Sequence, residues 1–96
     1  MKNNFDISEF VNTPTIQSIL VSLTERVKLR RKELKISQKL LAQQSGVAYA
    51  SIRRFENTGE ISLVSLLKIA KSLNCLEDFN ALFGNRIITN IKDLDL

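Results

Sequence analysis

The sequence predicts a small all-α fold in a single domain, for three reasons. Only three glycines and one proline occur in 96 residues, too few for a turn-rich β fold. Between residues 16 and 83 the apolar side chains recur at intervals of three and four, the period of an amphipathic helix. A chain of this length can bury only a modest core, so we expect one domain.

The first helix is expected over residues 13–34. Thr13 is placed to cap it, and Pro14 suits the first helical position because proline has no N–H to leave unpaired. One apolar stripe runs along this helix: Ile16, Leu20, Leu23, Val27 and Leu34. A helix this long is open to a kink or break within residues 18–24. The polar, weakly patterned residues 1–12 are expected to form a flexible N-terminal arm.

The central stretch, residues 37–57, is predicted to form two short helices joined by one glycine. Ser37 can cap the first helix with its hydroxyl, and Gly46 comes where the chain must turn with a positive φ. In the second helix Ile52 and Phe55 face inward at i, i+3 spacing. The opposite face carries Tyr49, Ala50, Arg53 and Arg54. This is a helix-turn-helix whose second helix has an outward face suited to a DNA groove.

Two further helices are expected to complete the domain, which we place at residues 13–83. The fourth, capped by Ser62, buries an apolar face made of Leu63, Leu66, Leu67, Ala70 and Leu73. The fifth, over residues 76–83, closes the base of the bundle with Leu76, Phe79, Leu82 and Phe83. In the tail, residues 84–96, a strand over 87–91 and a short helix capped at Thr89 both remain open. The isoleucines and leucines of this tail suit contact with a dimer mate or a second protein.

The net charge of +4 is unevenly distributed. Residues 26–54 hold nine Lys and Arg against one acid, a local charge of +8, so the rest of the chain sums to −4. A basic half beside an acidic half is what a phosphate-facing surface requires. For residues 28–35 alone, a solvated helix face explains the charges equally well. The adjacent helix-turn-helix favours the phosphate-facing interpretation.

Several function classes are excluded or disfavoured by the composition. The chain has no histidine, which excludes His-based catalysis and His-ligated metals, and its single cysteine, Cys75, excludes an intrachain disulfide. No nucleophile–base pair, carboxylate cluster, metal-ligand spacing or phosphate-cradling glycine loop is present, so we expect neither an enzyme nor a cofactor. No apolar run reaches the ~18 residues of a membrane span, and the N-terminus lacks the apolar core of a signal peptide. We therefore expect a cytoplasmic protein.

Residues 24–83 resemble the lambda repressor-like helix-turn-helix of the XRE family. The matching residues are Ser37-Gln38, Leu41-Ala42, Gly46-Val47, Ile52, Arg54, Glu56-Asn57 and residues 66–70 (Leu-Leu-Lys-Ile-Ala). The two-helix core followed by Glu-Asn, a glycine and a Leu-Leu-x-x-Ala helix makes this resemblance specific. A much weaker resemblance, over residues 53–62, is to antitoxins paired with HipA-type kinase toxins.

The resemblance implies roles for individual residues. Arg31 is expected to pair with Glu56, which would link the first and third helices; the alternative is that Arg31 contacts phosphate. Base contacts are expected from Tyr49, Ala50 and Arg53, on the outward face of the recognition helix. Phosphate contacts are expected from Gln38, Ser51, Arg54, Asn57 and Thr58.

The chemistry of the side chains bears on three of these expectations. Arginine reads guanine through two parallel hydrogen bonds to O6 and N7, which suits Arg53 to direct base readout. Tyr49 departs from the Gln, Arg or Ser that the family more often has there, and a hydrogen bond to phosphate is the alternative. For Arg54 a base contact, a phosphate contact and an internal ion pair are all open, with phosphate preferred.

The sequence therefore predicts a regulator of transcription that binds a specific double-stranded DNA sequence. We expect it to bind a palindromic operator as a homodimer and to repress its own gene. Half-sites one helical turn apart, about 34 Å, follow from a two-fold dimer of such domains. The alternative is an interaction module that neutralises a HipA-type kinase toxin, as an antitoxin, with DNA binding secondary.

Overall fold

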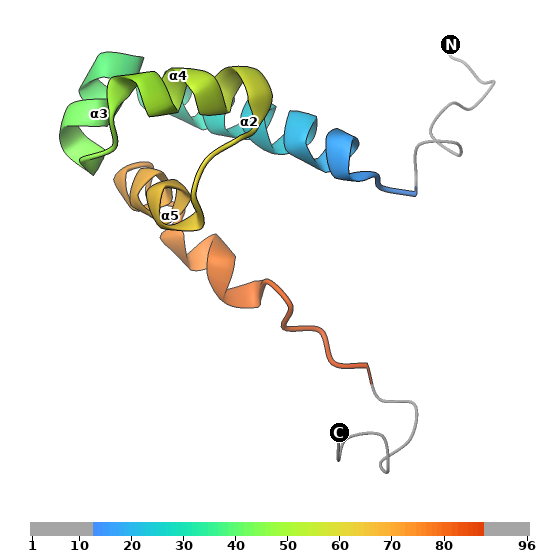
Figure 1. Ribbon diagram of the computed structural model, residues 1–96. Coiled ribbons are helices and arrows are strands. Elements are labelled where there is room, and N and C mark those ends of the chain that lie inside the picture. Colours follow the sequence, from blue (N-terminus) through green and yellow to red (C-terminus); the bar gives the residue numbers. More distant parts are fainter. Residues whose placement is uncertain (1–12, 88–96) are drawn as a thin grey trace.

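The computed structural model describes residues 13–87, and within that range every regular element is a helix. Four α-helices are labelled in Figure 1: α2 (Ile16–Glu33), α3 (Gln38–Ser45), α4 (Tyr49–Thr58) and α5 (Leu63–Ser72). The 3-10 helix η1 (Leu76–Ala81) follows them in the chain. The predicted all-α fold is confirmed. The N-terminal arm, residues 1–12, and most of the C-terminal tail, residues 88–96, lie outside the described residues.

Helix α2 begins two residues later than predicted. Its N-cap is Thr15, whose hydroxyl accepts the N–H of Ser18 at 3.0 Å while Ser18 Oγ accepts the N–H of Thr15 at 2.9 Å. This reciprocal arrangement is a capping box, which satisfies two otherwise orphaned donors. Neither Thr13 nor Pro14 is part of the helix, so the predicted cap at Thr13 is wrong. The helix runs without a break through residues 18–24.

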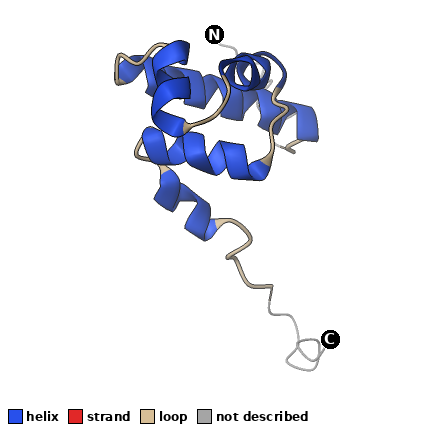
Figure 2. Cartoon of the chain, turned by 60° about the vertical axis from the view of Figure 1, so that its left-hand side comes forward, coloured by secondary structure: helices blue, strands red, loops and turns tan. Residues whose placement is uncertain are grey.

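The core lies where α3, α4 and α5 meet. A cluster of buried side chains fills it: Leu41, Val47, Ile52, Ile69 and Leu73. Helix α3 packs against both α4 and α5, and α2 packs against α4. Figure 2 shows the helices gathered into one body. Val27 of α2 covers one edge of this cluster, whereas Ile16, at the start of the predicted stripe, is 84% exposed. Burial of the stripe therefore begins after the first turn of α2.

Two glycines end the two helices of the central motif. Gly46, with φ of 78°, is the C-cap of α3, and its N–H donates to Ala42 O at 3.0 Å. The positive φ predicted for Gly46 is confirmed. Gly59, with φ of 84°, ends α4 in the same way. A Cβ added at Gly59 would lie 3.1 Å from Leu20 Cβ, so here a side chain would also crowd α2.

The end of the domain differs from the prediction. The fifth helix is a short 3-10 helix that leads away from the body (Figure 1). Leu82 is 58% exposed and Phe83 is fully exposed, so neither closes the base of the bundle. Leu63 was expected in the core, but as the first residue of α5 it stays 64% exposed because no neighbouring element covers it.

Candidate nucleic-acid interface

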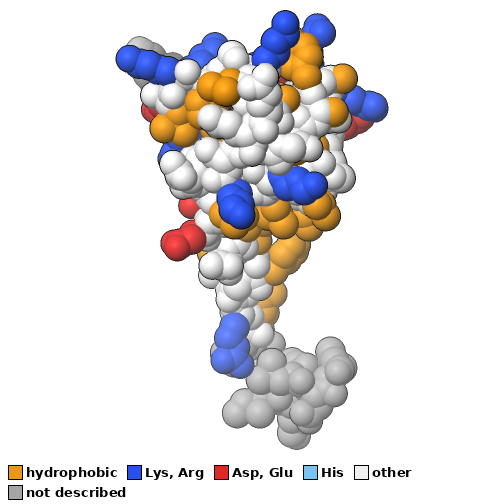
Figure 3. All heavy atoms as spheres, turned by 90° about the vertical axis from the view of Figure 1, so that its left-hand side faces the viewer, with side chains coloured by type: hydrophobic (Ala, Val, Ile, Leu, Met, Phe, Trp, Pro, Cys, Tyr) orange, Lys and Arg blue, Asp and Glu red, His pale blue; other side chains and the backbone are white. Residues whose placement is uncertain are grey.

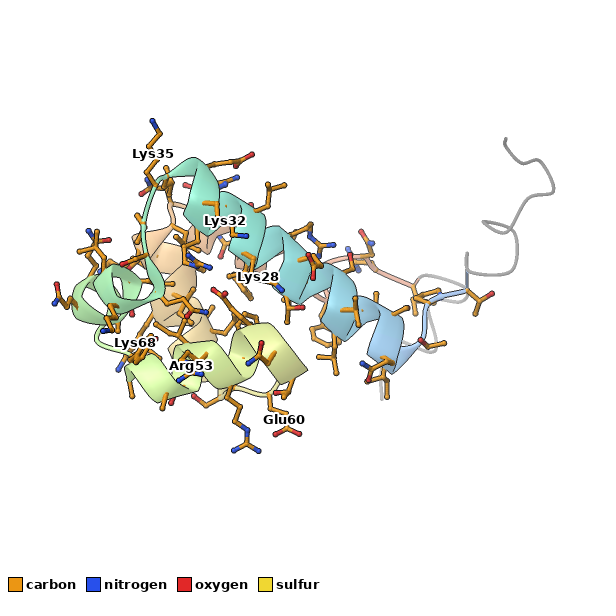
Figure 4. The ribbon with its side chains drawn as sticks, turned by 90° about the horizontal axis from the view of Figure 1, so that it is seen from above. Lys28, Lys32, Lys35, Arg53, Glu60 and Lys68 are labelled. Carbon is orange, nitrogen blue, oxygen red and sulfur yellow. The ribbon has the colours of Figure 1, made fainter. Side chains whose placement is uncertain are left out.

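Helix α4 separates its side chains cleanly into two faces. Ile52, Phe55 and Glu56 are buried, with Ile52 and Phe55 almost completely removed from solvent. Exposed side chains lie on the outward face: Tyr49, Ala50, Arg53, Arg54 and Asn57. The three residues predicted to contact bases are therefore all on the solvent side of the helix. Figure 4 shows Arg53 on α4, with Glu60 beside the end of that helix.

The N-terminus of α4 is left without a side-chain cap. Ala48 occupies the N-cap position and has no group that can accept a hydrogen bond from the first turn. The first N–H groups of a helix have no intrahelical partner, and together they form the positive end of the helix dipole. The start of the recognition helix thus presents free donors, a property that favours a phosphate or another anion nearby.

A buried polar network fixes the orientation of α4 against α2 and α3. The carboxylate of Glu56 accepts from Arg31 Nε at 2.8 Å and Arg31 Nη2 at 3.0 Å, a two-pronged ion pair. It also accepts from Gln38 Nε2 at 2.9 Å. Arg31 Nη1 donates in turn to Ile36 O at 3.0 Å. The expected Arg31–Glu56 pair is thus present, and Gln38 extends it to a third helix.

The buried charges of this network are compensated by partners and hydrogen bonds. Arg31 and Glu56 are only 9% and 4% exposed, so each charge is largely removed from water. Burying a charge is costly unless a partner and further hydrogen bonds compensate it. Within residues 13–87 no buried side-chain nitrogen or oxygen lacks a hydrogen-bond partner. The network therefore holds the recognition helix at a defined angle without leaving an orphaned charge.

The residues expected to contact phosphate lie at the start of α3 and along α4. Gln38 is the first residue of α3 and uses one amide N–H for Glu56, which leaves its second N–H to donate elsewhere. Ser51 is half-buried in the first turn of α4. At the other end of α4, the Thr58 hydroxyl donates to Arg54 O at 2.8 Å and accepts the N–H of Glu60 at 3.1 Å. Asn57 is exposed beside it.

Arg54 forms an ion pair with Glu60, just beyond the end of α4. The internal pair was one of three roles left open by the sequence. Both side chains remain about two-thirds exposed, at 68% and 63%. A pair so open to solvent is weak, so a phosphate can compete for Arg54.

Sequence reasoning missed a contact between the two helices of the motif. Lys39 Nζ of α3 lies 5.7 Å from the centroid of the Tyr49 ring, and Arg53 Cζ lies 5.6 Å from the same centroid. The Tyr49–Arg53 half could have been anticipated, because residues four apart on a helix are neighbours. The Lys39 half depends on how α3 and α4 pack, and no local pattern reveals it.

The basic residues spread beyond the recognition helix. Figure 4 shows Lys28 and Lys32 in order along α2, with Lys35 just past its end. Lys28, which is half-buried, forms an ion pair with the exposed Glu25 at 3.2 Å, and this pair reduces the local positive charge. These cations add to the positive field around the motif, as the charge distribution predicted.

An apolar groove lies between α2, α5 and η1. Its volume is about 720 Å³, and its apolar lining includes Ile19, Leu23, Leu29, Leu66, Phe79 and Leu82. Charged side chains of both signs also line it: Arg26, Arg30, Glu33 and Asp78. In Figure 3, hydrophobic side chains gather at the base of the body and continue along the segment that leads away from it.

Two further observations concern residues 13–87. No three acidic, cysteine or histidine side chains in this range are grouped so that they could hold a metal ion. None of its helices combines the length and the apolar character that crossing a bilayer would require.

The fold and the outward cationic helix define the class of protein: a helix-turn-helix domain of the DNA-binding type. Residues 27–79, more than half of the chain, match the HTH_3 family, described as helix-turn-helix. The chain therefore belongs to this family of DNA-binding regulatory domains, and its fold is lambda repressor-like. No curated protein and no solved structure gives a significant match.

Proposed function

We propose that this protein binds a specific double-stranded DNA sequence through α4 and represses transcription of its own gene. One observation carries the proposal: α4 turns a cationic face to solvent while the Arg31–Glu56–Gln38 network braces its opposite face. A rigidly held helix with exposed Arg side chains is what major-groove readout requires.

In the proposed complex, α4 lies in the major groove and α3 crosses the phosphate backbone. Arg53 reads a guanine, Ala50 offers its methyl group to a thymine methyl, and Tyr49 lies beside them. Phosphate contacts come from the first turn of α3 and from positions along α4: Gln38, Ser51, Arg54, Asn57 and Thr58. The free N–H groups at the start of α4 add to these contacts.

The decisive experiment is selection of a binding site from random duplex DNA, followed by fluorescence anisotropy with the selected site and single-base variants. Wild type should discriminate at the guanine read by Arg53 by ~1–3 kcal/mol. Arg53→Ala should remove most of that discrimination. Lys71→Ala, an exposed cation on α5 outside the proposed contacts, is the matched control. Selection of no sequence by the wild type would refute the proposal.

We also propose that the protein binds its operator as a homodimer that uses the groove between α2, α5 and η1. The groove is apolar and carries both Arg and Glu or Asp side chains. In a two-fold pairing the same patch meets itself, so cations of one copy can meet acids of the other.

The dimer is tested by light scattering of two variants on the same helix. Leu29, 59% exposed, lines the groove, whereas Val21, 50% exposed, does not. Leu29→Asp should lower the measured mass to that of the monomer, and Val21→Asp should not. If both variants are dimers, the interface lies elsewhere. If the wild type is a monomer at micromolar concentration, the proposed homodimer is refuted.

The alternative we propose is neutralisation of a HipA-type kinase toxin. Residues 53–62 resemble such antitoxins only weakly, and the apolar groove offers a surface for a partner protein. The test is co-expression with the product of the neighbouring gene, if that gene encodes a kinase-like protein. A stable co-purified complex and loss of kinase activity would support the antitoxin role. Absence of any such complex would refute the antitoxin role and leave DNA-binding regulation as the proposed function.

A further inference from the structure

Tyr49 occupies a position between two cations that come from different helices. It is the first residue of α4, and its ring has Arg53 of the same helix at 5.6 Å and Lys39 of α3 at 5.7 Å. Both distances lie within the roughly 6 Å at which a cation is attracted to the face of an aromatic ring. The ring therefore bridges the two helices of the motif on their solvent side.

Two like charges converging on one side chain require an explanation. Lys39 and Arg53 repel each other, and each loses rotamer freedom when it is held in one place. The electron-rich ring face of Tyr49 offsets both costs because it attracts each cation. Tyr49 remains 37% exposed with both cations in place, so these contacts lie at the surface of the motif.

We propose that Tyr49 is a positioning residue: its ring holds Lys39 and Arg53 as one preorganised pair facing the DNA. Arg53 then reaches the base edge from a fixed position, and Lys39 meets the neighbouring phosphate. The ring face of Tyr49 positions the two cations, and its hydroxyl has no part in this role. This inference rests on the proposed DNA binding and replaces a direct base or phosphate contact by Tyr49 with an indirect role.

The first test needs no DNA. In nuclear magnetic resonance spectra of the free protein, the methylene protons next to the Lys39 and Arg53 charges should be shifted upfield by the Tyr49 ring current. Tyr49→Phe should preserve these shifts, and Tyr49→Leu should abolish them. Unshifted resonances in the wild type would overturn the proposal at once. Thermal melting of each variant establishes that it is folded.

The second test measures base discrimination with the selected site. Tyr49→Phe should discriminate as the wild type does, since phenylalanine keeps the ring face. Tyr49→Leu should lower discrimination at the base read by Arg53 by about two- to fivefold, the value of one exposed cation–π contact. In an Arg53→Gln background, Tyr49→Leu should have no further effect at that base.

The outcomes separate this inference from the function on which it rests. Equal losses in Tyr49→Phe and Tyr49→Leu would assign the hydroxyl a direct contact and overturn the positioning role. A Tyr49→Leu loss that persists without Arg53 would also overturn it. Ring-current shifts in a wild type that shows no sequence preference would instead refute the proposed DNA readout and leave the ring contacts in place.

Discussion

Glu56 shows how one side chain can connect three helices. Its two carboxylate oxygens accept from Arg31 of α2 and Gln38 of α3, while its own backbone belongs to α4. A carboxylate with both oxygens engaged in this way has little rotational freedom. The angle at which the recognition helix leaves the body therefore depends on a polar contact as well as on apolar packing.

Replacing Glu56 with Gln should destabilise the fold strongly. The substitution leaves the buried Arg31 guanidinium without a compensating charge, which costs about 3–5 kcal/mol. Urea unfolding measures the loss. The double variant Arg31→Met/Glu56→Leu should recover most of the stability, because a well-packed apolar pair often replaces a buried ion pair at little cost. Glu77→Gln, exposed on η1, is the control and should stay within about 0.5 kcal/mol of wild type.

Replacing Glu60 with Gln should strengthen DNA binding rather than weaken it. The exposed Arg54–Glu60 pair adds little to stability, about 0–1 kcal/mol. Removing the carboxylate frees Arg54 and removes a negative charge beside the proposed phosphate contacts. A unit charge in water at ~7 Å is worth about 0.6 kcal/mol, so affinity should rise roughly threefold at low salt. Weaker binding than wild type, measured by anisotropy, would mean that Glu60 holds Arg54 in its productive position.

At the scale of the elements, the helix ends decide the geometry of the motif. Ser37, Gly46 and Gly59 begin or end α3 and α4, and the two glycines take positive φ values of 78° and 84°. The same backbone conformation serves different purposes at the two glycines. Gly46 has open space around it, whereas Gly59 lies against Leu20 of α2.

Alanine substitutions should therefore separate backbone strain from crowding. Gly46→Ala meets no atom within 4 Å and should cost only the strain of a left-handed residue, about 1–2 kcal/mol. Gly59→Ala carries the same strain and adds a contact at 3.1 Å, so it should cost about 1 kcal/mol more. Urea unfolding of both variants tests the difference. Equal losses would show that Leu20 moves aside freely.

At the scale of the whole molecule, charge and shape are divided between two regions. The basic stretch, residues 26–54, contains the C-terminal part of α2 and all of α3, and it ends within α4. The groove formed by α2, α5 and η1 is largely apolar, although Arg26 and Arg30 of the basic stretch also line it. This division suits a protein that meets a polyanion with one surface and another protein with the other.

Binding should accordingly be strongly salt-dependent. If one domain neutralises six phosphates, a plot of log Kobs against log salt concentration should have a slope of about −5. Affinity would then fall by roughly 10³ between 50 and 200 mM salt. Anisotropy titrations over that range measure the slope. A slope near zero would exclude the basic surface as the phosphate contact.

Local patterns in the sequence determined the helical class, the helix-turn-helix at residues 37–57 and the buried side of α4. Each of these depends on residues within about four positions of one another, as Ile52 and Phe55 do, so periodicity and caps are sufficient to find them. Even the start of α2 was within reach, because Thr15 and Ser18 have capping-box spacing.

Only the tertiary structure decided which surfaces stay uncovered and which distant side chains meet. Lys39 lies ten residues before Tyr49, and its place over the ring follows from how α3 packs on α4. Leu82 and Phe83 are as apolar as core residues, yet they stay exposed because η1 leads away from the body. Apolar character favours the burial of a side chain but does not determine which surface covers it. The packing of whole helices determines that.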